Sequence, residues 1–119
     1  MNNYTPITSR TEEFAIRIIK ACSFLDETPG VKRTLSNQLL RSGTSIGANV
    51  HEAQSAQSNR DFIHKLEIAL KEARETEYWL KILIKSNTVE ENKFASLLEE
   101  VKEINRILIT SVVKLKEKS

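Results

Sequence analysis

The sequence has few of the residues that interrupt helices. Only two of its 119 residues are proline and three are glycine, and aromatic residues make up 6%. Long stretches therefore run without a turn signal, which favours an all-α protein. Hydrophobic residues make up 39% and charged residues 29%, which argues against disorder. A chain of this length is expected to form one domain around a single core.

Long apolar runs, a strong net charge and a second cysteine are also missing. No window holds about 18 apolar residues, so no transmembrane helix is predicted, and the first residues lack the pattern of a signal peptide. We therefore expect a cytoplasmic protein with no membrane partner. The single cysteine, Cys22, falls on an apolar helical stripe and is predicted to be a buried, reduced thiol; a reactive or metal-binding thiol is the alternative.

Apolar residues recur at helical spacing in four segments separated by short turn signals. Ser9 to Glu12 matches a capping box, so residues 1–8 are predicted to be a flexible lead and residues 9–117 the domain. Pro29 and Gly30 separate the first two segments, and Ser58 caps the third. Four long helices with short loops predict an antiparallel up-down-up-down bundle. The apolar stripe of the first helix consists of Phe14, Ile18, Cys22 and Leu25.

The second helix, expected from about residue 31 to about residue 57, carries Gly43 and Gly47 in its interior. Each glycine costs a helix roughly 0.5–1 kcal/mol relative to alanine, which indicates a close neighbour on that side. We expect that neighbour to be the third or fourth helix or another subunit; a break at 41–45 is the alternative. A second row is polar and suits either a solvated face or a hydrogen-bonded seam between helices. This row consists of Gln38, Ser42, Ser45, Asn49 and Glu52.

The third and fourth helices have the clearest apolar patterns. The third is predicted to bury a row with alternating spacings of four and three, while either Tyr78 or Trp79 lies off it. The fourth is apolar on more than one side over 107–113, which predicts a subunit interface at Ile107, Ile109 and Val113. A fully central fourth helix is the alternative. The predicted row of the third helix is Phe62, Leu66, Ala69, Ala73, Thr76, Leu80 and Leu83.

No arrangement of residues indicates catalysis. Asp61 and His64 have the spacing of half a di-iron site, but the second Glu-x-x-His is missing, since Ala48 stands three residues before His51. No Ser–His–Asp pattern, phosphate-binding glycine loop or CxxC pair is present. We therefore predict a protein that is not an enzyme and has no cofactor and no metal.

Nucleic-acid binding depends on how the cations are distributed. A formal net charge of +2 is too small to demand such a partner, but phosphate contacts need only local clustering. The alternative is a mixed charged surface that keeps a bundle soluble. The cations that assembly could gather are Arg17, Lys20, Lys32, Arg33, Arg41, Arg60, Lys65, Lys71, Arg74, Lys81 and Lys85.

Residues 39–79 resemble the bacterial four-helix bundle family of proteins encoded in 23S rRNA intervening sequences, sometimes labelled ribosomal proteins. The resemblance is carried by Leu-Leu-Arg-Ser at 39–42, Ser-Ile-Gly-Ala-Asn-Val at 45–50, Asp-Phe-Ile at 61–63 and the run at 66–77. Three features depart from the family pattern: His51 replaces the usual alanine, Gln54 stands where the family tends to show glycine, and Arg60 is the only cation in the loop after the second helix. The signature positions are Arg41, Ser42, Ser45, Asn49 and Glu52.

The resemblance implies a left-handed bundle that assembles as a ring, a homopentamer, with a link to structured RNA or DNA. It also points to the accessory variability proteins of diversity-generating retroelements, which cooperate with a reverse transcriptase. An adaptor for such a polymerase, without nucleic-acid contact, is the alternative function. Signature residues are expected in binding or in packing. The candidates for nucleic-acid contact are Lys32, Arg33, Arg41, Arg60 and Lys65.

Overall fold

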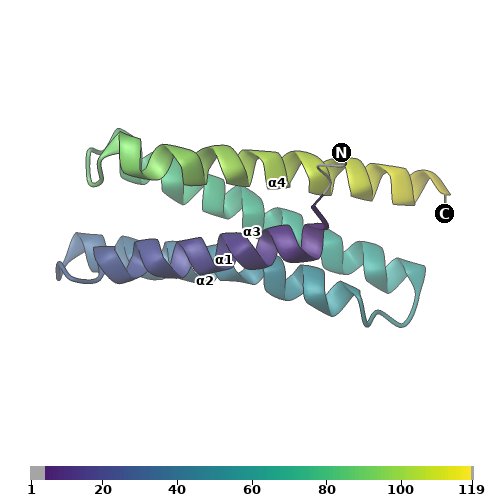
Figure 1. Ribbon diagram of the computed structural model, residues 1–119. Coiled ribbons are helices and arrows are strands. Elements are labelled where there is room, and N and C mark those ends of the chain that lie inside the picture. Colours follow the sequence, from purple (N-terminus) through teal and green to yellow (C-terminus); the bar gives the residue numbers. More distant parts are fainter. Residues whose placement is uncertain (1–4, 119) are drawn as a thin grey trace.

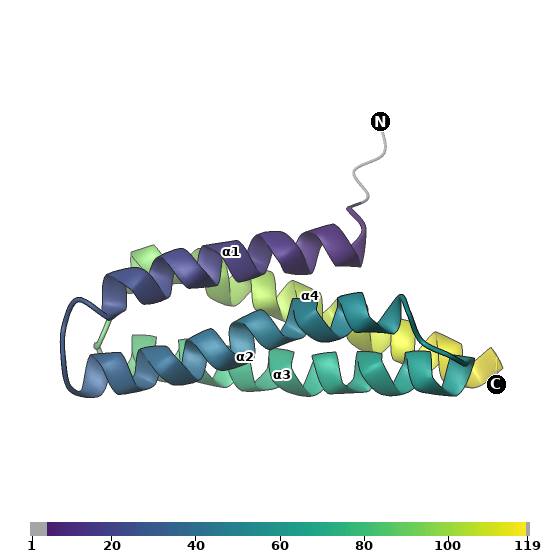
Figure 2. The ribbon, with the colours of Figure 1, turned by 90° about the horizontal axis from the view of Figure 1, so that it is seen from below.

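A computed structural model describes residues 5–118, and within this range the chain forms four α-helices and no strand (Figure 1). They are α1 (Ile7–Leu25), α2 (Val31–Ala53), α3 (Asn59–Lys85) and α4 (Glu91–Lys118). Successive helices run in opposite directions. The α1–α2 and α3–α4 loops lie at one end, and the α2–α3 loop lies at the other beside the end of α4 (Figure 2). The predicted all-α, antiparallel up-down-up-down four-helix bundle is confirmed.

Each helix supplies one apolar row to a common core. The predicted row of α1 is buried along its whole length, including Cys22. On α3, six of the seven predicted positions are buried, but Ile63 replaces Phe62 at the first turn. Phe62 is half-buried and packs against the same core. The row of α4 consists of Phe94, Leu97, Val101, Ile104, Leu108 and Val112.

The helix starts were predicted with mixed success. Ser58 caps α3 as expected, because its hydroxyl accepts the backbone N–H of Asp61 at 3.0 Å. The capping box at Ser9 is wrong, because α1 begins earlier, at Ile7, after Pro6 at the N-cap. The ring of Pro6 fixes φ near the helical value and its carbonyl accepts Arg10 N–H at 2.9 Å. Residues 1–4 of the predicted lead lie outside the described residues, and the division at residue 8 stays a prediction.

The two helix-interior glycines allow α1 to approach α2 closely. α2 is continuous through 41–45, so the predicted alternative of a break is wrong. A Cβ on Gly43 would lie 2.9 Å from Cγ2 of Ile18, and one on Gly47 would lie 3.2 Å from the carbonyl oxygen of Thr11. The neighbour is therefore α1, and not the third or fourth helix as expected. Periodicity defines the face that packs but not the helix that packs against it.

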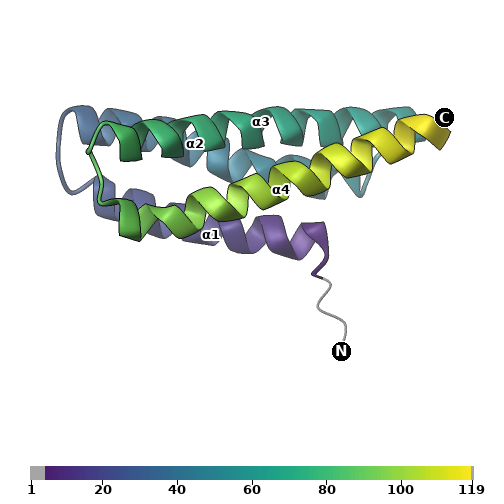
Figure 3. The same ribbon diagram turned by 90° about the horizontal axis from the view of Figure 1, so that it is seen from above.

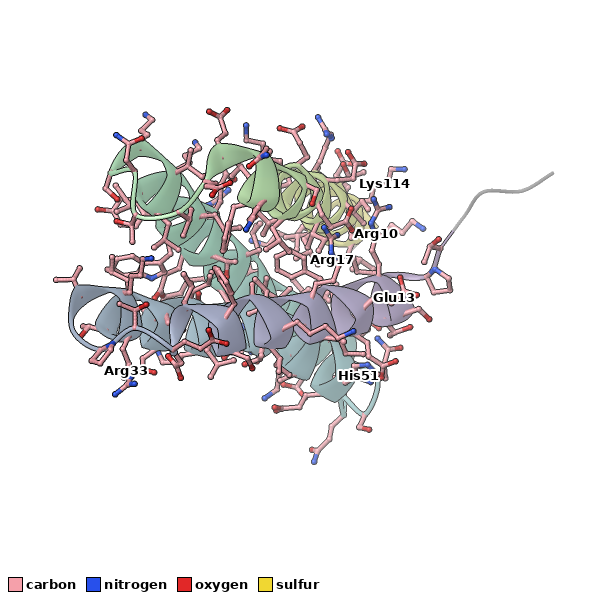
Figure 4. All side chains as sticks on the ribbon, turned by 60° about the vertical axis from the view of Figure 1, so that its left-hand side comes forward. Arg10, Glu13, Arg17, Arg33, His51 and Lys114 are labelled. Carbon is pink, nitrogen blue, oxygen red and sulfur yellow. The ribbon has the colours of Figure 1, made fainter. Side chains whose placement is uncertain are left out.

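The contact between α1 and α4 is made partly by polar side chains. Arg10 donates two hydrogen bonds to Glu100, at 2.6 and 3.1 Å, and this pairing raises the pKa of the guanidinium. Arg17 donates to the hydroxyl of Ser96 at 2.9 Å. Arg10 and Arg17 both extend from α1 toward α4 (Figure 4). Along its length α4 moves away from α1 and toward the start of α3 (Figure 3).

This departure leaves apolar side chains of α4 exposed. Ile109 is 40% and Val113 51% exposed, while Ile107 is half-buried, so α4 is not the fully central helix of the alternative prediction. On α1, Ile16 and Ile19 are each 48% exposed. Each of these two helices thus exposes a pair of apolar side chains three or four residues apart. None of the described helices combines the length and the hydropathy needed to cross a membrane.

Candidate nucleic-acid interface

The five cations predicted to contact nucleic acid do not form one surface. Lys32 and Arg33 belong to the first turn of α2, whereas Arg60 and Lys65 belong to the start of α3, beyond the other end of α2. A helix of 23 residues is about 34 Å long. Arg33 and His51 accordingly lie near opposite ends of the bundle (Figure 4). Arg33 also donates to the backbone carbonyl of Asp26, at 2.8 and 3.2 Å, and so closes the α1–α2 loop.

Arg41, the fifth cation, is neutralised by α3. Its guanidinium forms an ion pair with Glu75 and lies 3.7 Å from a carboxylate oxygen of Glu72. The same side chain donates to Gln38 at 3.3 Å. The carboxylate of Glu75 also accepts the indole N–H of Trp79 at 3.2 Å. Arg41 is therefore a link between α2 and α3, which leaves it little free charge for phosphate.

The other signature residues follow the same seam between α2 and α3. The buried hydroxyls of Ser42 and Thr76 are hydrogen-bonded at 3.0 Å, and Glu52 pairs with Lys65 at 3.0 Å. Ser45 and Asn49 instead bond within α2. Their partners are the carbonyls four residues earlier, at 2.6 and 2.8 Å. The polar row predicted on α2 is thus a hydrogen-bonded seam at Ser42 and Glu52.

The solvent side of α3 carries a continuous row of mostly cationic side chains, which we call the basic stripe. Its members are three or four residues apart, so they share one face of the helix. From first to last they span about 37 Å. Six of the eight are exposed, and the other two, Glu67 and Lys81, are half-buried. The basic stripe consists of Arg60, His64, Glu67, Lys71, Arg74, Tyr78, Lys81 and Lys85.

Four of the five carboxylates of α3, all except Asp61, have a partner on a flanking helix. Glu72 and Glu75 face Arg41 of α2, as described above. Glu77 accepts a hydrogen bond from Asn105 of α4 at 2.8 Å and pairs with Lys81 at 3.0 Å. Glu67, the one acid in the stripe, pairs with Lys116 of α4 at 2.6 Å.

This sorting of charge leaves the stripe positive. The stripe contains five lysine and arginine side chains, and of these Lys81 pairs with Glu77. Among the described residues, no carboxylate forms an ion pair with the other four, which are Arg60, Lys71, Arg74 and Lys85. The basic stripe was not recognised in the sequence, although its cations were among those noted there. The signal that could have revealed the stripe was the spacing of three and four residues between these cations. This spacing places them on one face of a single helix, so no assembly of subunits is needed to gather them.

A cavity of about 740 Å³ opens at the first turns of the stripe, between α3 and the end of α4. Arg60, His64 and Lys116 supply its basic groups, and Ile63 is an apolar part of its wall. Asp61 and His64 lie here, but within residues 5–118 no group of three or more His, Cys, Asp or Glu side chains is placed to hold a metal ion.

The fold and this face together define a small four-helix bundle with one basic edge. The chain belongs to the 23S rRNA-intervening sequence protein family, whose model matches residues 5–110. A 1.70 Å crystal structure of a protein of unknown function from the S23 ribosomal protein family of Bacteroides thetaiotaomicron is similar, with a TM-score of 0.83 and 46% identity. The similarity covers 90% of this chain and 98% of that one. No curated protein matches the chain.

Proposed function

We propose that this protein is a non-enzymatic, nucleic-acid-binding bundle that contacts phosphates along the basic stripe. The observation that carries the proposal is the sorting of charge on α3: four of its five acids have partners on α2 or α4, while four of its cations are exposed and have no carboxylate partner among the described residues. Phosphate contacts supply most of the sequence-independent affinity of nucleic-acid-binding proteins. The name of the family refers to intervening sequences of 23S rRNA, which makes a structured RNA the first ligand to test.

Salt-dependent binding tests this proposal. Each neutralised phosphate adds about −0.9 to the slope of log K against log salt for duplex DNA and about −0.7 for a single strand. Removing two contacts with Lys71→Gln/Arg74→Gln should therefore reduce the magnitude of the slope by about 1.4 to 1.8. Fluorescence anisotropy of a labelled RNA between about 50 and 200 mM salt measures it.

α1 provides a matched control for this variant. Arg17 and Lys20 are exposed and three residues apart on one helix, like Arg74 and Lys71. Arg17→Gln/Lys20→Gln removes the same net charge and should leave the slope unchanged. Equal losses from both pairs would show that only net charge matters and would overturn the assignment to α3. No binding of RNA or DNA by the wild type at about 50 mM salt would favour the adaptor for a retroelement reverse transcriptase instead.

We also propose that the bundle assembles into a ring, with five subunits as the family resemblance implies. A closed ring of more than two subunits is held by two different surfaces that meet head to tail. The chain has two such candidates, Ile109 with Val113 on α4 and Ile16 with Ile19 on α1. Assembly would cover both apolar surfaces and repeat the basic stripe around the ring.

A further inference from the structure

Tyr78 is the one aromatic member of the basic stripe. It is 56% exposed, four residues after Arg74 and three before Lys81. Residues at these spacings are neighbours on a helix surface, with about 5–6 Å between their Cβ atoms. An exposed ring is therefore flanked along α3 by the guanidinium of Arg74, which has no carboxylate partner among the described residues, and by Lys81, which pairs with Glu77.

The ring of Tyr78 is supported from the side by Trp79. Their centroids are 5.2 Å apart and the ring planes meet at 71°, an edge-to-face contact. Trp79 is half-buried, and its indole N–H is anchored on Glu75, which Arg41 holds from α2. An edge-to-face contact covers at most one face of either ring, so Tyr78 keeps at least one face free. Through Trp79, Glu75 and Arg41, the ring of Tyr78 is therefore connected to the seam between α2 and α3.

This geometry distinguishes between classes of nucleic acid. Bases in a duplex are stacked on each other and present only their edges to a protein. Unpaired bases can stack on aromatic side chains while cations beside them hold the backbone. We propose that the basic stripe binds an unpaired, single-stranded stretch of nucleic acid, with one base stacked on Tyr78 and a neighbouring phosphate held by Arg74. This inference rests on the proposed function.

The test uses the full-length chain with two probes, a 12-nucleotide single-stranded oligouridylate and a 12-base-pair RNA duplex of mixed sequence. A stacked base contributes about 1–3 kcal/mol, so Tyr78→Ser should weaken binding of the single strand about 5- to 140-fold. Tyr78→Leu, which keeps an apolar contact on Trp79 but has no π face, should lose a similar factor. Tyr78→Phe should bind like the wild type. Duplex affinity and both salt slopes should stay unchanged.

Three outcomes would overturn the inference: unchanged single-strand binding by Tyr78→Ser, equal losses for strand and duplex, or competition by polyglutamate as strong as by unlabelled oligouridylate. Because Tyr78 is exposed, all three variants should keep the helical circular dichroism of the wild type. Lys71→Gln/Arg74→Gln separates the two proposals. If that pair weakens binding and Tyr78→Ser does not, the stripe binds nucleic acid without stacking. If neither matters, the proposed interface itself is wrong.

Discussion

Ser42 on α2 and Thr76 on α3 are both fully buried and meet hydroxyl to hydroxyl at 3.0 Å. Thr76 also bonds the carbonyl of Glu72, four residues earlier in α3, at 2.8 Å. A buried polar pair specifies register because an axial shift would break the hydrogen bond that joins the two helices. The sequence signature of the family thus includes a point at which α2 and α3 are aligned.

Thr76→Val should destabilise the bundle by about 1–3 kcal/mol, because the buried Ser42 hydroxyl loses its partner on α3. Replacing both residues, with Ser42→Ala/Thr76→Val, should cost less than the sum of the single changes, since no polar group is then stranded. Urea unfolding of the four proteins of this cycle gives the coupling energy. Strictly additive effects would show that the two hydroxyls do not stabilise each other.

Gly43→Ala distinguishes a close helix contact from an ordinary exposed glycine. At an unobstructed helix position this change should stabilise by about 0.5–1 kcal/mol. Here the new Cβ would lie 2.9 Å from Ile18, a β-branched, fully buried side chain. Overpacking of about 1–3 kcal/mol should exceed the propensity gain, so the midpoint of thermal unfolding should fall. A higher midpoint would mean that α1 does not approach Gly43 this closely.

Cys22 should make stability decrease at alkaline pH. Burial raises the pKa of its thiol above the ordinary 9.0, and the hydrogen bond with Ser36 opposes this more weakly. The folded state therefore favours the neutral thiol. Its contribution is fully present below the unfolded-state pKa and is lost as pH rises from about 9 toward the folded-state value. Cys22→Ala should flatten this part of the pH profile, and the native thiol should react with an aromatic disulfide reagent only on unfolding.

Two variants test the ring. Ile109→Asp/Val113→Asp and Ile16→Asp/Ile19→Asp should each lower the mass measured by light scattering toward 13.6 kDa. In a head-to-tail contact the two variants retain complementary intact surfaces, so an equal mixture should form dimers. Val31→Asp, at a site that is 71% exposed, is the matched control and should leave the mass unchanged. A wild type of 13.6 kDa at micromolar concentration would exclude the ring.

Most of the fold could be predicted from apolar periodicity, because each helix must bury one apolar face and this places apolar residues at every turn of α1 and α3. The start of α1 was missed because Pro6 is the N-cap residue, so Ser9 already lies within the first turn of the helix. The neighbour of Gly43 was missed because spacing along one helix contains no information about which other helix approaches. Which helix approaches Gly43 depends on the angles at which the helices cross, and these are defined only in the folded protein.

The candidate site was predicted less well, for a related reason. Lys71, Arg74 and Lys85 were visible as cations, but their importance depends on where the nearby acids point. Glu72 and Glu75 are directed to Arg41, and the Arg41–Glu75 pair joins residues 34 positions apart. A local pattern cannot show that Arg41, which matches the family signature, has its charge used inside the seam while Lys71 remains free.

The direction of the α3 carboxylates also affects how the molecule meets a polyanion. With most of its acids paired across the seams, α3 presents a locally positive edge, which acts as a positive pole for an approaching polyanion although the formal net charge is only +2. A charged field of this kind rotates an approaching partner before contact and raises the fraction of productive collisions. Association with a nucleic acid should therefore be faster than the net charge alone suggests, and should slow as added ions screen that pole.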